Sequence, residues 1–288
     1  MLELAIIGLS PQHPRSFSEL INKENPNGEG LNGVARISML WDRDRAAAEA
    51  FVAEHGLDTV LDSPTAAIGK ADGVLVLEDP GDTHLELARP YLEAGVPTFV
   101  DKPFALGIDH AKEMVRLAQA HNTPLMSSSA LRYAREVIDF KENEKELVGE
   151  TRVAVATGPN ELVYYGIHAA ELFYTVMGPG IAWVRNEYTD EYDLVHVRYT
   201  DGRAVTMQII RTARYGFLLS VYGTEGTAEI SVRDANFFYA EQMRNVVRMI
   251  QTRENPIPHE EMLEIIGMLV AAKQSGETGE RVELSSVL

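Results

Sequence analysis

A lysine with the chemistry of an acid or a base follows a short apolar strand. Residues 97–100 form the predicted strand, and Asp101, Lys102 and Pro103 come directly after it. Ligands bind outside the carboxyl ends of parallel strands, and a partly buried lysine at such a place can take up or release a proton. A surface lysine is the alternative interpretation, because most lysines are exposed. The neighbouring Asp101 and Pro103 favour the functional interpretation, since proline fixes the backbone of a tight turn.

A nucleotide-binding loop is predicted after the first apolar run, residues 4–8. There the chain reads Gly8-Leu9-Ser10-Pro11-Gln12-His13. A dinucleotide-binding loop has the pattern Gly-x-Gly-x-x-Gly, so that Ser10 and His13 stand in place of its last two glycines. Serine is small enough to be tolerated, whereas we expect His13 to crowd the contact between strand and helix. If it does, replacing Ser10 and His13 by glycine would create or strengthen NAD binding.

The acidic residue that accompanies such a loop follows the second predicted strand, residues 34–41. A carboxylate at Asp42 would accept hydrogen bonds from the ribose of NAD. Asp42 lies further from Gly8 than the usual span of about twenty residues, and an insertion at residues 22–33, rich in Asn and Gly, explains the excess. Arg43 and Arg45 keep NADP open as the cofactor, because a 2′-phosphate favours an arginine.

These residues require a fold whose strands end at one edge. Apolar runs alternate with amphipathic helical patterns in the first part of the chain, which predicts a Rossmann-type, doubly wound parallel sheet. The predicted strands are residues 4–8, 34–41, 73–77, 97–100 and 124–126, and the predicted helices are residues 46–55, 83–94 and 108–120. Residues 1–125 are therefore the predicted dinucleotide-binding domain.

The pattern changes after about residue 130, where strand patterns follow one another with few helices between them. Asp201-Gly202 and residues 223–226 are hairpin turn signals, which indicate an antiparallel meander. The predicted strands are residues 152–157, 194–200, 203–211, 217–222 and 227–232, and the predicted helices are residues 165–177 and 260–273. Residues 126–288 are therefore predicted to be an α+β domain for substrate binding and oligomerisation, with a mostly antiparallel open sheet. One face of that sheet should be covered, and the other should be wetter or lie against a partner subunit.

Several motifs, taken in order, resemble the Gfo/Idh/MocA oxidoreductases, the relatives of glucose-fructose oxidoreductase and inositol dehydrogenase. Residues 100–103 are similar to the family's Glu-Lys-Pro motif, with Asp101 in place of Glu. Residues 79–84 resemble its Thr-Pro-Asn-x-x-His turn and keep Pro80 and His84. His168 opens a helix where the family has its catalytic histidine, and the end of the chain resembles the family's C-terminal signature. The resemblance covers essentially the whole chain.

The resemblance implies roles for several side chains. Lys102 would be the acid/base on a substrate hydroxyl beside a nicotinamide, and the peptide bond before Pro103 is a candidate for the cis form. His168 would assist as proton relay or substrate partner, with a merely packing or capping histidine as the alternative. Tyr164 stands where the family usually has an Asp. The residues predicted to contact substrate are Lys102, Arg132, Tyr164, Tyr165 and His168. The residues predicted to contact the cofactor are Gly8, Ser10, His13, Asp42, Arg43, Pro80, His84, Asp101 and Lys102.

Composition excludes several other classes of protein. The 26 basic and 43 acidic side chains give a net charge of −17, which disfavours nucleic acid as a partner. The absence of cysteine excludes disulfides, cysteine zinc sites and thiol nucleophiles, and the eight histidines are scattered without metal-ligand spacing. No apolar run has the length of a membrane span and the N-terminus lacks signal-peptide features, so we expect no membrane contact and a cytoplasmic protein. A homodimer or homotetramer is expected.

Two functions compete at this point. The leading hypothesis is an NAD(P)-dependent oxidoreductase that acts on a hydroxyl of a sugar, cyclitol or related polyol, with NAD favoured by Asp42. The alternative is a non-catalytic relative that binds a sugar-like ligand or a partner without redox turnover. The altered glycine loop and Tyr164 favour the alternative, whereas Lys102, His168 and Asp42 favour the enzyme.

Overall fold

A computed structural model describes residues 1–24, 30–79, 81–214 and 216–288. The chain divides into two compact units. The first consists of residues 1–105, 109–128 and 239–259, and the second of residues 106–108, 129–238 and 260–288. The sequence predicted a single cut after residue 125, whereas in the structure the chain returns to the first unit at residue 239.

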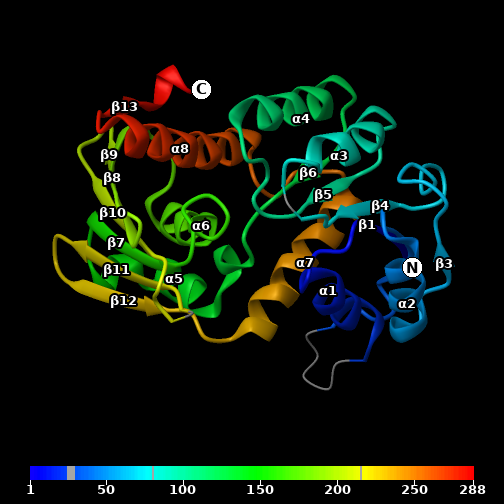
Figure 1. The fold of residues 1–288 in the computed structure, drawn as a ribbon. Coiled ribbons are helices and arrows are strands. Elements are labelled where there is room, and N and C mark those ends of the chain that lie inside the picture. The colour runs from blue at the N-terminus through cyan, green and yellow to red at the C-terminus, as the bar shows by residue number, and fades with distance from the viewer. Residues whose placement is uncertain (25–29, 80, 215) are drawn as a thin grey trace. The chain divides into compact units, whose positions relative to one another are not determined.

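The first unit holds a six-stranded parallel sheet in the order β3-β2-β1-β4-β5-β6 (Figure 1). This is the classic strand order of a dinucleotide-binding fold, with the order reversing between β1 and β4. Its strands are β1 (Leu2–Ile7), β2 (Ala35–Trp41), β3 (Thr59–Val60), β4 (Gly73–Val76), β5 (Thr98–Val100) and β6 (Leu125–Met126). The central strands β4 and β5 are buried throughout, as expected for a sheet covered on both faces. The predicted Rossmann-type sheet is confirmed.

Helices connect these strands. They are α1 (His13–Asn22), α2 (Arg45–His55), α3 (His84–Glu93) and α4 (Ile108–Ala120). Helix α2 shows why the local signals worked, because Asp44 caps its start through the amides of residues 46 and 47 and Gly56 ends it at φ 67°. Helix α1 was not predicted as an element, although a proline in its first turn suits a helix start.

A further helix, α7 (Ala235–Thr252), contributes its residues from 239 onward to the first unit. Ile250 fills the space above Gly73, where a Cβ on the glycine would lie 2.5 Å from its side chain. The Gln242 amide donates to the Ser128 carbonyl at 2.8 Å, and Asn255, which follows the helix, accepts from the Leu125 amide at 2.9 Å. These contacts explain why the first unit is not continuous in sequence.

The second unit holds a seven-stranded sheet in the order β12-β11-β7-β10-β9-β8-β13 (Figure 1). Its strands are β7 (Thr151–Pro159), β8 (Ile181–Tyr188), β9 (Tyr192–Tyr199), β10 (Ala204–Ile210), β11 (Leu218–Gly223), β12 (Thr227–Ser231) and β13 (Val282–Glu283). Only β7 and β10 pair in parallel, so the prediction of a mostly antiparallel sheet is confirmed. The simple meander is wrong in one respect, because β7 lies between the successive strands β10 and β11.

Helix α6 (Gly166–Met177) contacts β7, β10 and β11 and is buried over most of its length. The strands alternate accordingly, and β10 buries every second residue from Val205 to Ile209. The remaining helices are η1 (Ala130–Tyr133), α5 (Arg135–Leu147), α8 (His259–Thr278) and η2 (Leu284–Ser286). Within the described ranges, no helix is both long and apolar enough to cross a membrane.

Candidate active site

A glycine turn at the end of β1 is the first part of the site. Gly8 has φ +93°, and a Cβ there would lie 2.5 Å from the Glu78 Cβ and 2.8 Å from its Cα. Both the backbone conformation and the close approach of the segment after β4 therefore require glycine. The Gly8 amide donates to the Trp41 carbonyl at 2.7 Å, which joins the ends of β1 and β2.

Asp42 lies at this turn, as predicted. One carboxylate oxygen accepts from the Leu9 amide at 2.7 Å and the other from the Asp44 amide at 2.8 Å. Arg43, the candidate partner of a 2′-phosphate, is instead paired with Glu78 at 2.6 Å and with Glu86 at 3.4 Å. The hydrogen bond from Arg43 to Glu78 raises the pKa of the guanidinium above its ordinary value. These pairings favour NAD over NADP.

The turn fits a phosphate group in two respects. Ser10 Oγ is buried and has no hydrogen-bond partner among the residues that the structure describes. The first turn of α1 receives no side-chain cap from Gln12. A hydroxyl donor and uncapped amides at a helix N-terminus are the groups that bind a dinucleotide phosphate. A bound dinucleotide would therefore be held by Ser10, the start of α1 and Asp42.

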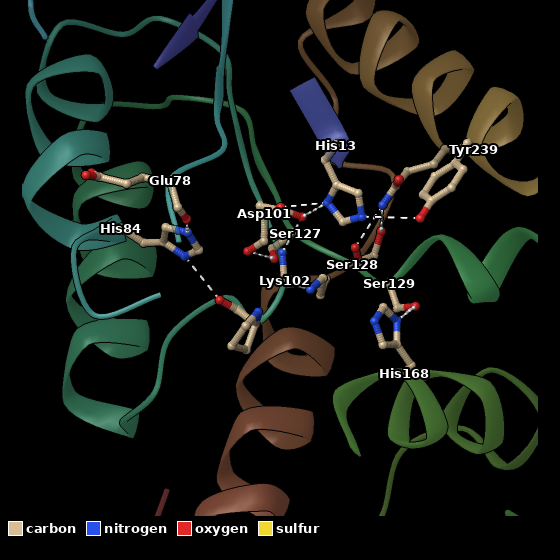
Figure 2. A network of polar contacts seen from close by, with 12 residues as sticks. His13, Glu78, His84, Asp101, Lys102, Ser127, Ser128, Ser129, His168 and Tyr239 are labelled. Carbon is tan, nitrogen blue, oxygen red and sulfur yellow. Dashed lines mark hydrogen bonds and ion pairs between the residues drawn. The ribbon is translucent and has the colours of Figure 1, made fainter. Parts of the chain in front are cut away.

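His13 does not crowd the strand–helix contact, contrary to expectation. The side chain is buried, and its Nδ1 lies 2.6 and 2.8 Å from the two carboxylate oxygens of Asp101. Its ring stacks on Phe17 with centroids 5.2 Å apart. The imidazole thus occupies a packed site at the carboxyl end of β5, where Asp101 accepts a hydrogen bond from it (Figure 2).

The turn that carries Lys102 is held by its neighbours. The Lys102–Pro103 peptide bond is cis, as the resemblance allowed, and the Lys102 amide donates to Asp101 Oδ1 at 2.7 Å. His84 is buried, with Nδ1 3.1 Å from the Pro103 carbonyl and Nε2 2.8 Å from the Glu78 carbonyl. His84 therefore joins the turn after β5 to the segment after β4, and its contact with the cofactor stays a prediction. Pro80 lies outside the described residues.

In the second unit, His168 lies in the first turn of α6. Its Nδ1 is 2.7 Å from Ser129 Oγ, which also accepts from the Leu131 amide at 3.2 Å (Figure 2). Tyr165 contacts the imidazole edge-on at 5.5 Å, and Tyr164 lies beside Tyr165 with ring centroids also 5.5 Å apart. Three of the residues predicted to contact substrate are thus neighbours, namely Tyr164, Tyr165 and His168. Ser129 was missed, although a run of three serines, residues 127–129, follows β6.

Arg132, predicted to face the substrate, lies in a buried ion-pair cluster of the second unit. Its Nε is 2.8 Å from Glu171 and its Nη1 is 3.0 Å from Glu261. Burial acts to lower the pKa of Arg132, but the carboxylates, Glu171 first, hold it above its ordinary value. The contacts give Arg132 a structural role, and a role toward substrate stays a prediction.

The first unit brings most of the predicted cofactor residues to the carboxyl edge of its sheet. They are Gly8, Ser10, His13, Asp42, Arg43, His84, Asp101 and Lys102. The second unit brings together His168, Tyr164 and Tyr165. Across the described part of the chain, no group of three or more His, Asp or Glu side chains is placed to hold a metal ion.

Comparison with known proteins agrees with this geometry. Residues 2–129 match the model of the Gfo/Idh/MocA family, described as an oxidoreductase family with an NAD-binding Rossmann fold. Inositol 2-dehydrogenase of Paracoccus denitrificans is 31% identical over 180 residues, which are 58% of this chain and 50% of that protein. Inositol 2-dehydrogenase of Ralstonia nicotianae is 30% identical over 100 residues, 34% of this chain and 30% of that protein. The matched regions thus span half or less of these curated relatives.

Solved structures show the same fold. A probable dehydrogenase from Thermotoga maritima has a TM-score of 0.88 at 17% identity and covers 100% of both chains. Myo-inositol dehydrogenase from Lactobacillus casei, solved in complex with NAD(H) and myo-inositol, has a TM-score of 0.84 at 17% identity and covers 98% of this chain and 96% of its own. The predicted resemblance is confirmed over residues 2–129, which carry the glycine turn and the Asp-Lys-Pro motif and match the Gfo/Idh/MocA oxidoreductase family with its NAD-binding Rossmann fold.

Proposed function

We propose that the protein is an NAD-dependent oxidoreductase that moves hydride between the nicotinamide and a hydroxyl of a sugar, cyclitol or related polyol. The observation that carries the proposal is the glycine turn, where Ser10, Asp42 and the start of α1 fit a dinucleotide within the segment that matches the NAD-binding family. The inositol dehydrogenases among the relatives make inositols the first substrates to test.

In this proposal Lys102 is the acid/base for the substrate hydroxyl. The turn after β5 positions it, because Asp101 accepts the Lys102 amide and His84 holds the Pro103 carbonyl. The bound nicotinamide supplies the hydride acceptor, and Lys102 takes the hydroxyl proton at Nζ. His168 assists as a hydrogen-bonding partner of the substrate, with its ring oriented through Nδ1 by Ser129.

The cofactor is tested first. We would titrate the purified protein with NADH and NADPH, following nicotinamide fluorescence and the rise of the thermal midpoint. We expect NADH to bind in the micromolar range or tighter and NADPH more weakly, since Arg43 is already paired with Glu78 and Glu86. If a folded protein binds neither, the non-catalytic alternative replaces the proposal.

Turnover is tested next with myo-inositol, scyllo-inositol and simple sugars in the presence of NAD. Lys102→Ala should abolish NADH formation while leaving the thermal midpoint near that of the wild type, because Lys102 is partly exposed. Lys70→Ala is the matched control, since Lys70 is an exposed lysine of the same unit. An unchanged rate for Lys102→Ala on a confirmed substrate would refute the assigned role.

We also propose a homodimer or homotetramer. The face of the second sheet away from α6 presents apolar side chains, with Val153 41% and Tyr222 44% exposed. Light scattering of the purified protein tests this, and a monomer at micromolar concentration would contradict it.

A further inference from the structure

The two departures from the family pattern in the first unit contact each other. His13 stands where the third glycine of the fingerprint belongs, and Asp101 stands where the family has Glu. The residues are far apart in the chain, yet His13 Nδ1 lies 2.8 and 2.6 Å from the two Asp101 oxygens. The two side chains are 10% and 5% exposed, so this hydrogen-bonded contact is almost wholly removed from water.

Three other residues contact the imidazole of His13. Nδ1 meets Asp101, and Nε2 lies 3.3 Å from the Tyr239 hydroxyl at the other side of the ring (Figure 2). Phe17 stacks on the ring from within α1. The ring is thus held by α1, by α7 and by the end of β5.

The charged groups around the pair favour an ionised Asp101. Burial acts to raise the pKa of the Asp101 carboxyl, but the imidazole of His13 and, more weakly, Lys102 and His84 hold it below its ordinary value. The carboxylate in turn accepts the Lys102 amide at 2.7 Å. A continuous set of hydrogen bonds therefore leads from the start of α1 through Asp101 to the backbone of Lys102.

The sizes of the two side chains are complementary. A glutamate at position 101 would extend its carboxylate by one carbon–carbon bond, about 1.5 Å, toward an imidazole that is already in hydrogen-bond contact. A glycine at position 13 would instead leave the Asp101 carboxylate buried without this partner, which is costly. Each departure from the family pattern thus fits the structure only in the presence of the other.

We propose that His13 is a positioning residue of the dinucleotide site, and that His13 and Asp101 form a matched pair in place of the family's glycine and glutamate. His13 fixes the Asp101 carboxylate, and the carboxylate fixes the Lys102 turn relative to the glycine turn. The role toward cofactor rests on the proposed function, whereas the pairing itself does not.

A double-mutant cycle tests the pair. His13→Gly, Asp101→Glu and the double variant are compared with the wild type for NADH affinity and for the urea midpoint of the first unit. Trp41 reports on that unit once Trp183, which lies in the second unit, is replaced by Phe. Loss of a charged hydrogen bond should weaken NADH binding about tenfold or more in each single variant. The double variant should recover to within a few-fold of the wild type, because it restores the family combination.

His13→Gly with Asp109→Glu is the matched control, since Asp109 is exposed in the same unit and should show no coupling. His13→Asn gives a second readout, because its amide can donate to Asp101 without an imidazole. We expect His13→Asn to keep an NADH affinity within a few-fold of the wild type. We expect His13→Ala to bind NADH about tenfold or more weakly, like the other single variants. Additive effects in the cycle, or equal losses in the Asn and Ala variants, would overturn the proposal.

Failure of the proposed function is distinguishable from failure of the pair. If the wild type binds no NADH, the proposed role of His13 toward the dinucleotide is refuted. The coupling between His13 and Asp101 is then measured from the urea midpoints alone. Additive midpoints would then refute the matched pair as well, whereas non-additive midpoints would leave His13 as a positioning residue of the Lys102 turn only.

Discussion

Removing the guanidinium of Arg132 should destabilise the second unit strongly. Arg132→Met leaves Glu171 and Glu261 without their shared cation, and the side chains of Arg132 and Glu171 are only 12% and 4% exposed. Breaking a buried ion pair from one side costs about 3–5 kcal/mol, because a charge remains buried without compensation. Since whole domains are stable by about 5–15 kcal/mol, this single change should remove a large part of the stability of the unit.

The measurement is a urea unfolding curve followed by tryptophan fluorescence. The chain has two tryptophans, Trp41 in β2 of the first unit and Trp183 in β8 of the second. In a Trp41→Phe background, Trp183 reports on the second unit alone, and the midpoint should fall sharply in Arg132→Met. In a Trp183→Phe background, the transition of the first unit should change much less.

The loss of stability in Arg132→Met should also depend on pH. Burial raises the pKa of Glu171 above 4.5 even with Arg132 present, and loss of the cation raises it further. Below the ordinary pKa both folded and unfolded chains carry the proton, so Glu171 causes little penalty there. As pH rises above that value, only the unfolded chain ionises readily, and the deficit of Arg132→Met should grow toward neutrality.

Two control variants make the reasoning refutable. Arg152→Met removes an arginine of the same unit whose pair with Glu150 is 57% and 76% exposed, and it should cost less than about 1 kcal/mol. Replacing Arg132 and Glu171 together by Met should cost less than Arg132→Met alone, because no buried charge is stranded. If Arg132→Met destabilises no more than Arg152→Met but weakens substrate binding, the side chain serves the substrate and not the fold.

The other predictions concern the two candidate sites. Gly8→Ala should abolish NADH binding in a fluorescence titration and lower the thermal midpoint, because its Cβ would lie 2.5 Å from Glu78 Cβ at φ +93°; unchanged binding would show that the turn is not the cofactor site. Ser129→Ala should lower kcat on a confirmed polyol and shift its pH profile while KM for NAD stays constant, since Ser129 orients His168; an unshifted profile would remove that role. The lowered pKa of Asp101 contributes stability that is present above the unfolded value near 3.8 and lost as pH falls through the folded value. Urea midpoints between pH 5 and pH 3 should therefore fall more steeply in the wild type than in Asp101→Asn, and parallel curves would contradict this.

Local patterns in the sequence were enough to predict the parallel sheet. Strands β1, β4 and β5 are short apolar runs, and helix α4 matches the predicted residues 108–120 at both ends. Glycines at strand and helix ends, such as Gly8 and Gly56, adopt the left-handed backbone that only glycine adopts readily. The prediction succeeded where one segment carries its own signal.

Pairings between distant segments could not be predicted in this way. His13 was expected to obstruct the loop, because nothing near it in the sequence reveals Asp101 as its partner. Likewise, nothing near Arg132 in the sequence indicates Glu171 as its partner, and nothing near Ser129 indicates His168. Helix α7 and strand β8 were also missed, and no glycine stop marks the end of α7 at Thr252. The site therefore had to be read from the fold.

The return of α7 to the first unit determines when that unit can finish folding during synthesis at the ribosome. Ile250 packs on Gly73, Gln242 binds the Ser128 carbonyl, and Asn255 binds the Leu125 amide. The sheet of β1 to β6 therefore lacks its contacts with α7 until the entire segment from residue 129 to residue 238 has been translated. The second unit is completed later still, because its last segment, residues 260–288, is translated after the part of α7 that closes the first unit.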